Sequence, residues 1–126
     1  ISVLKVQNPE YISFSAIARF ISVQGGSEFA VYDAENNDQF RYDTKLKLLP
    51  KQKAEWMDGH RLLLVSEQKL VVFDFDGTNR QTLNDANPAY SIFFDRDYEA
   101  LFTFTASKTD KNRPALTRTE LRILPR

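Results

Sequence analysis

The sequence predicts an all-β protein made of repeated antiparallel units of four short strands. Apolar runs of strand length alternate with turn residues through most of the chain. No stretch keeps apolar residues at a period of 3.6 over three turns, so no long helix is expected. A similar pattern also recurs about every forty residues, which indicates a repeat architecture.

The clearest unit covers Ala54 to Leu83. Asp-Gly pairs separate apolar runs rich in Val, Leu and Phe, which is the usual signature of β-hairpins. Its strands are expected to end at Trp56-Met57 and to cover Arg61 to Val65, Lys69 to Phe75 and Arg80 to Leu83. The turns between them are Asp58-Gly59-His60, Glu67-Gln68 and Asp76-Gly77-Thr78-Asn79.

Two weaker units flank this one. Asn8-Pro9-Glu10-Tyr11 recurs as Asn87-Pro88-Ala89-Tyr90, an offset of 79 (87 − 8). Tyr32-Asp33 aligns with Phe73-Asp74 at an offset of 41, and Asp58 aligns with Asp95 at an offset of 37. Four-stranded repeats of about forty residues are typical of propeller blades, so the sequence predicts a β-propeller-type fold with about three blades.

The strands of the flanking units follow from the same pattern. The first unit is expected to hold strands at Tyr11 to Phe14, Ala18 to Val23, Glu28 to Tyr32 and Gln39 to Tyr42, with turns at Gly25-Gly26 and Glu35 to Asp38. The third is expected to hold strands at Tyr90 to Phe94, Ala100 to Thr105 and Leu116 to Ile123, with a polar loop at Ser107 to Pro114.

One predicted strand, at the start of the chain, belongs to none of the three units. A lone outer strand at 1–7, with Ser2 to Val6 as its core, precedes blade 1 at 8–49, blade 2 at 50–86 and an incomplete blade 3 at 87–126. Closed propellers typically need four or more blades. The chain is therefore expected either to belong to a longer propeller or to form a homodimer by edge-strand exchange, giving six blades. An opening Ile1 instead of Met favours a fragment or a processed form.

The central unit carries a family resemblance. Its aromatic-x-Asp-Gly and Phe-Asp-x-Asp-Gly-x-Asn motifs rest on Trp56, Asp58, Gly59, Phe73, Asp74, Asp76, Gly77, Asn79 and Leu83. The motif resembles the WD-like repeats of TolB-like bacterial β-propellers and of the C-terminal propeller part of PEGA-domain envelope proteins. The first and third units match in outline, with Ala34-Glu35-Asn36 and Arg96-Asp97 in place of Asp-Gly. The resemblance implies a non-catalytic scaffold or protein-binding domain in the bacterial cell envelope, which is an extracytoplasmic location.

Composition excludes several partners. Seventeen basic and seventeen acidic residues give no net charge, so no nucleic-acid partner is expected. The lysines at 45, 47, 51 and 53 are interpreted as a solvated strand edge. The chain has no cysteine, which excludes disulfides and thiolate metal sites and leaves the compartment open. No apolar run reaches spanning length and no signal peptide is seen, so direct membrane insertion is not expected.

One motif offers an enzymatic alternative. Val71 to Thr78 resembles the first motif of haloacid-dehalogenase-like phosphatases, in which Asp74 would be the nucleophile and Asp76 the general acid, with magnesium bound beside them. That motif needs a helix after the strand, whereas Asn79 to Leu83 returns at once into another strand. A turn with Gly77 at positive φ is favoured.

Other candidate ligands lack the required pattern. A calcium loop over Asp74, Asp76 and Asn79 would need a later glycine and a bidentate glutamate. The acidic turn Asp33 to Asp38 lacks the pattern as well. His60 is the only histidine and is expected in an exposed turn. The serines at 13, 15 and 22 are interpreted as ordinary polar positions. No catalytic residue, metal or cofactor is therefore predicted.

The predicted function is protein interaction or scaffolding through the loops that connect the blades. These candidate binding loops are Lys45 to Lys53, Asn84 to Pro88 and the longest one, Ser107 to Pro114. A spacer role between other modules is a further alternative. The aromatics Phe14, Trp56 and Phe93 are expected to pack between neighbouring blades, and Tyr11 and Tyr90 are the alternative lining of a binding face.

Overall fold

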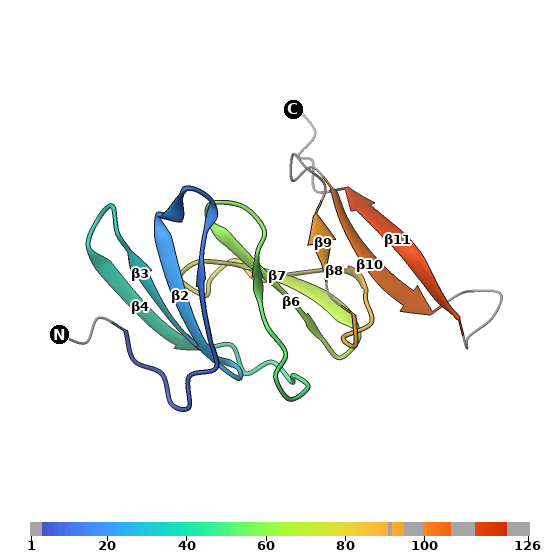
Figure 1. The fold of residues 1–126 in the computed structure, drawn as a ribbon, viewed down its shortest axis with the longest axis horizontal. Helices are drawn as coiled ribbons and strands as arrows, with labels where there is room; N and C mark the ends of the chain where they lie inside the picture. The colour runs from blue at the N-terminus through green and yellow to red at the C-terminus, as the bar shows by residue number, and fades with distance from the viewer. Residues whose placement is uncertain (1–3, 91, 95–99, 107–112, 121–126) are drawn as a thin grey trace.

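The computed structural model describes residues 4–90, 92–94, 100–106 and 113–120. Strands make up 54% of these residues, and no α-helix occurs among them. Three antiparallel sheets lie one after another along the long axis of the molecule (Figure 1). The all-β prediction and its antiparallel units of four, four and three strands are confirmed, and the three sheets do not close into a ring.

Each sheet is a meander, because strands that follow one another in the chain are hydrogen-bonded neighbours. The first sheet comprises β1 (Tyr11–Phe14), β2 (Phe20–Gly25), β3 (Glu28–Asp33) and β4 (Asp38–Asp43). The second comprises β5 (Glu55–Trp56), β6 (Arg61–Ser66), β7 (Lys69–Asp74) and β8 (Gln81–Asp85). The third comprises β9 (Phe93–Phe94), β10 (Ala100–Ala106) and β11 (Pro114–Glu120).

Turn geometry sets several strand ends. Glu67 and Gln68 both have positive φ, at 49° and 65°. A two-residue hairpin loop needs these φ values if its twist is to match that of the strands on either side. A single 3-10 turn at Ala16–Ala18 delays the start of β2, because Ile17 and Ala18 adopt positive φ. Tyr90 lies in a turn in which its N–H donates to the Asn87 carbonyl at 3.2 Å, so β9 begins only at Phe93.

The two ends of the chain differ from the predicted strands. Residues 4–6, the described part of the predicted strand Ser2 to Val6, form no strand. The last strand begins at Pro114, inside the predicted loop. Residues 107–112 of that loop and the predicted strand residues 121–123 lie outside the described residues.

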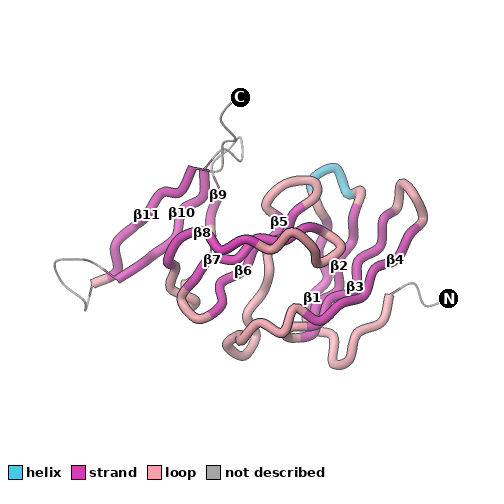
Figure 2. The backbone as a smooth tube through the Cα atoms, turned by 180° about the vertical axis from the view of Figure 1, so that it is seen from behind, coloured by secondary structure: helices cyan, strands magenta, loops and turns pink. Residues whose placement is uncertain are grey.

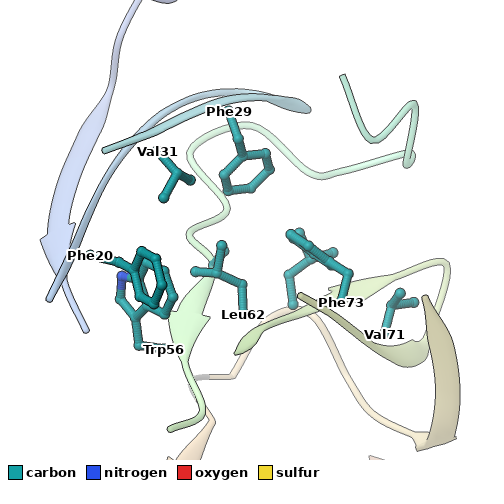
Figure 3. Packing of buried hydrophobic residues seen from close by; sticks show 9 residues of the cluster. Phe20, Phe29, Val31, Trp56, Leu62, Val71 and Phe73 are labelled. Carbon is teal, nitrogen blue, oxygen red and sulfur yellow. The ribbon is translucent and has the colours of Figure 1, made fainter. Parts of the chain in front are cut away.

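The first core lies between the first and second sheets. Alternation along β2 and β3 turns Phe20, Phe29 and Val31 toward the second sheet, where they meet Leu62, Phe73 and their neighbours (Figure 3). The Phe20 ring stacks on the Trp56 ring with centroids 5.9 Å apart. The Trp56 indole N–H donates to the Ser22 hydroxyl at 3.2 Å, so this buried polar atom is satisfied.

The second core lies between the second and third sheets. Leu63 and Val65 of β6 and Leu70 and Val72 of β7 meet Leu101 of β10 in one apolar cluster. The second sheet is thus buried on both faces, which explains why its two central strands are continuous apolar runs instead of alternating ones.

An ion pair fixes the β3–β4 turn to the start of β2. Asp33 is only 2% exposed, and its carboxylate accepts hydrogen bonds from the Arg19 Nε and Nη2 atoms, both at 3.2 Å. The same carboxylate accepts the backbone N–H of Glu35 at 3.0 Å. The hydrogen bonds from Arg19 are the main reason that the pKa of Asp33 falls from 3.8 to about 2.

We expect Asp33 to make the free energy of unfolding fall with pH over a defined acidic range. Because its folded pKa is depressed, its contribution is complete above about pH 4 and is lost as the pH falls through about 2. Urea unfolding at a series of pH values should show the wild type losing stability between pH 4 and pH 2 more steeply than Asp33→Asn. Parallel pH profiles for the two proteins would contradict this assignment.

Candidate functional site

The connections between sheets lie together at one end of the strands (Figures 1 and 2). Strands of a meander alternate in direction, so the β2–β3 and β6–β7 turns share that end with the connections. We call this surface the linker rim; it comprises Gly26–Ser27, Lys45–Lys53, Glu67–Gln68 and Asn84–Pro88. Backbone hydrogen bonds join turns to connections, from Thr44 N–H to the Ser27 carbonyl and from Ala86 N–H to the Gln68 carbonyl, both at 2.9 Å.

The larger groove of the linker rim lies between the second and third sheets. It has a volume of about 800 Å³ and combines the β6–β7 turn, the predicted binding loop Asn84 to Pro88, and Thr105 and Thr117 of the third sheet. The buried Ala86 and the half-buried Leu83 give it an apolar floor. Its other lining side chains are mainly polar: Glu67, Gln68, Lys69, Asn84, Asp85 and Asn87.

Hydrogen bonds to the third sheet hold the loop in this groove. The Asn84 amide nitrogen donates to the Thr119 hydroxyl at 2.8 Å. The Asn87 backbone N–H donates to the Phe104 carbonyl at 2.7 Å. Lys69 and Asp85 form an ion pair on the groove wall. The groove is therefore a fixed feature between two sheets, as a binding site requires.

The smaller groove, of about 320 Å³, lies beside the predicted binding loop Lys45 to Lys53. Gln24, which is 3% exposed, fixes this loop to the first sheet. Its Nε2 donates to the carbonyls of Gly26 and Gln52 at 3.0 Å, and its Oε1 accepts the Ala54 N–H at 2.9 Å. Sequence reasoning missed this residue. The available signal was an amide on the core-facing side of β2, in line with Phe20 and Ser22.

The four lysines of this loop are exposed, but they do not lie on a strand edge as predicted. The segment is irregular, and its leucines provide the reason, because Leu46 and Leu48 turn inward and pack against the first core. Lys47 lies 3.6 Å from the Glu67 carboxylate across the linker rim.

The aspartates of the phosphatase alternative lie in the β7–β8 turn at the opposite end of the sheets. Gly77 has a φ of 84°, as the turn interpretation predicted. The Asp74 carboxylate accepts the Asn79 amide at 2.6 Å, and the Asp76 carboxylate accepts the Thr78 backbone N–H at 3.2 Å and its hydroxyl at 2.6 Å. Among the described residues, no three His, Cys, Asp or Glu side chains are grouped to hold a metal ion.

We expect Asp74→Asn to leave the hydrolysis of p-nitrophenyl phosphate in magnesium unchanged from the wild type. Asp74 is the last residue of β7, which pairs with the antiparallel strand β8, and its carboxylate closes the turn between them by accepting the Asn79 amide. Initial rates with Asp76→Asn as a second variant provide the comparison. Turnover that depends on Asp74 would establish the enzymatic alternative.

The predicted inter-sheet aromatics divide into two groups. Trp56 packs between the first and second sheets, as predicted. Phe14 and Phe93 do not pack between sheets of this chain, being 59% and 57% exposed. The reason is their position, since Phe14 lies on β1 of the first sheet and Phe93 on β9 of the third, and no sheet of the described residues lies on the outer side of either end sheet.

The remaining candidate residues, His60, Tyr11 and Tyr90, are exposed or make contacts within the fold. His60 is exposed in its turn, as predicted, and its ring meets the edge of the Phe20 ring at 5.8 Å. The Tyr11 hydroxyl donates to the Lys51 carbonyl on the linker rim. Tyr90 is 42% exposed and lies against the Phe104 ring at 4.8 Å.

No protein-family model and no curated protein matches the sequence. The resemblance to TolB-like and PEGA-domain propellers, with the envelope location that it implies, therefore stays a prediction. The described part of the chain holds no helix with the length and hydrophobicity needed to cross a bilayer.

Proposed function

We propose that this chain is a non-catalytic, propeller-type protein-interaction module that binds a polypeptide segment on its linker rim. The main support is the larger groove, in which a predicted binding loop is held between two stacked sheets. The stacking of three meanders, of four, four and three described strands, face to face and in chain order, supports the proposal of a propeller-type architecture.

The chemistry of the groove favours a peptide over a small charged ligand. Asn84, Asn87 and Gln68 carry amides, which can both donate to and accept from peptide groups. Lys69 is paired with Asp85, and Glu67 lies 3.6 Å from the Lys47 ammonium, so each charge that lines the groove has a partner of opposite sign. Leu83 and Ala86 supply apolar contact for one or two side chains of the partner.

Selection from a displayed library of random peptides tests this function. We expect the wild type to enrich peptides that Asn84→Arg binds at least about tenfold more weakly, because the larger side chain fills the groove and removes an amide. Gln81→Arg is the matched control, since Gln81 is an exposed polar residue at the far end of the same strand, outside the groove.

Circular dichroism and thermal unfolding should show that both variants keep the fold. Peptides that bind Asn84→Arg and Gln81→Arg equally well would place the binding surface elsewhere. Failure to enrich any peptide would contradict the proposed function.

A further inference from the structure

The outer face of the first sheet is apolar and exposed. The register places Phe14 beside Ile21 and Ile12 beside Val23, on the side of the sheet away from the first core. Ile12 and Phe14 are 64% and 59% exposed, and Ile21 and Val23 are half-buried. Exposed apolar patches rarely remain uncovered on soluble proteins, so this face is a candidate interface.

The outer face of the third sheet is apolar as well. Phe93 pairs with Phe102, and Phe104 pairs with Leu116, on the side away from the second core. Phe93 and Leu116 are 57% and 63% exposed. Tyr90 extends the same patch through its contact with Phe104.

The internal repeat indicates what the outer face of the first sheet packs against. At the offset of 41 its Ile21, Val23, Ala30 and Tyr32 align with Leu62, Leu64, Val71 and Phe73. Those four residues form the face of the second sheet that packs on the first sheet. The outer face of the first sheet therefore has the composition of a face that packs on the sheet before it, and no such sheet is described in this chain.

We infer that two copies of this chain associate head to tail, with the outer face of the third sheet of each copy packed on the outer face of the first sheet of the other. The two faces cannot meet within one copy, because the second sheet separates them (Figure 1). Two copies of three sheets give six, a number within the range of closed radial assemblies of four-stranded sheets. Two such contacts related by a twofold axis close the assembly.

Charge does not oppose burial of either face. Arg41 of β4, on the outer side of the first sheet, is paired with Glu28 at 2.6 Å. Arg118 of β11 is paired with Glu120. Asp43, the third charged residue on the outer side of the first sheet, ends β4 and accepts hydrogen bonds from the Ser27 hydroxyl and the Lys45 N–H, both at 2.8 Å. These charges of the described residues lie on the edge strands β4 and β11 or, for Glu28, at the start of β3, and not at the centre of either face.

The area is of the order that a stable dimer needs. The five exposed side chains Ile12, Phe14, Tyr90, Phe93 and Leu116 would each bury on the order of 100 Å². Together with their half-buried neighbours they approach the roughly 800 Å² per partner of a standard interface.

Light scattering coupled to size-exclusion chromatography tests the inference. We expect a species of twice the 14.6 kDa chain mass at micromolar concentration. Phe14→Glu and Leu116→Glu should each lower the association constant at least about a hundredfold, because each variant buries an unpaired charge in both contacts of the dimer. Gln81→Glu, on an exposed strand position of the second sheet, is the control and should stay dimeric.

A mixture of the two variants separates head-to-tail contact from contact between identical faces. The Phe14→Glu copy keeps an intact third-sheet face, and the Leu116→Glu copy keeps an intact first-sheet face. One of the two contacts is therefore restored in the mixed pair, and we expect mixed dimers at concentrations at which each variant alone is monomeric. Dimerisation that only one of the two variants abolishes would indicate identical faces in contact and would overturn the inference.

A wild-type protein that is monomeric at all micromolar concentrations, or that forms open-ended polymers, would also overturn it. The inferred dimer rests on the sheet stacking of the proposed interaction module. The dimer and the peptide-binding function can nevertheless be disproved independently. Phe14→Glu leaves the groove at Asn84 unchanged, so peptide binding can be measured on a monomer.

Discussion

Replacing Phe20 by alanine is expected to lower the free energy of unfolding by about 3–5 kcal/mol, the usual cost of deleting a buried phenyl ring. Phe20 is fully buried, and its ring stacks on those of Trp56 and Phe75, with centroids 5.9 and 4.3 Å away. The surrounding strands belong to two different sheets, which limits how far they can collapse into the space left behind. Urea unfolding followed by tryptophan fluorescence and circular dichroism measures the change.

Phe14→Ala is the matched control, because it removes the same group from the same sheet at a position that is 59% exposed. Compared at a concentration at which both variants are monomeric, Phe14→Ala should cost less than about 1 kcal/mol. Equal losses for the two variants would mean that the first core contributes far less than its burial indicates.

Replacing Gly77 by alanine is expected to lower the free energy of unfolding by about 2–4 kcal/mol, from two causes that add. The residue has a φ of 84°, which strains any residue with a Cβ. An added Cβ would also lie 2.7 Å from the Tyr42 ring, which is packed against the first core and stacked on Phe29 at 5.7 Å. The Asp-Gly motif is therefore needed here for packing as well as for the turn.

Gly26→Ala separates the two causes. Gly26 also has a positive φ, of 58°, but nothing lies within 4 Å of the position that its Cβ would take. Its replacement should cost about 1 kcal/mol, the left-handed strain alone. If urea unfolding gave the same loss for both variants, the contact with Tyr42 would contribute nothing.

The repeat and the turns could be predicted because they depend on local chemistry. Glu67-Gln68 and Asp76-Gly77 lie between apolar runs whose length leaves room only for strands, so the hairpins follow from the residues themselves. The packing of Trp56 could also be predicted, because the second sheet has a neighbour on each side. The same rule misplaced Phe14 and Phe93, since it assumed a neighbour for the end sheets too.

The parts that could not be predicted depend on register and on contacts between distant segments. Arg19 meets Asp33 because β2 and β3 pair with a particular alignment, and the sequence does not fix that alignment. Gln24 meets Gln52 and Ala54 only once the connection folds back over the first sheet. The larger groove likewise needs the second and third sheets side by side, although Asn84 to Pro88 could be proposed as a binding loop from its position.

The place of Trp56 makes it a selective reporter of unfolding. It is the only tryptophan in the chain, and it packs in the first core, between the first and second sheets, and not in the second core. Its emission should follow the parting of the first two sheets, whereas far-ultraviolet ellipticity averages over all three. If the fluorescence and ellipticity transitions occur at different denaturant concentrations, the third sheet unfolds as a separate unit. Unfolding of the three stacked sheets then begins at one end of the molecule.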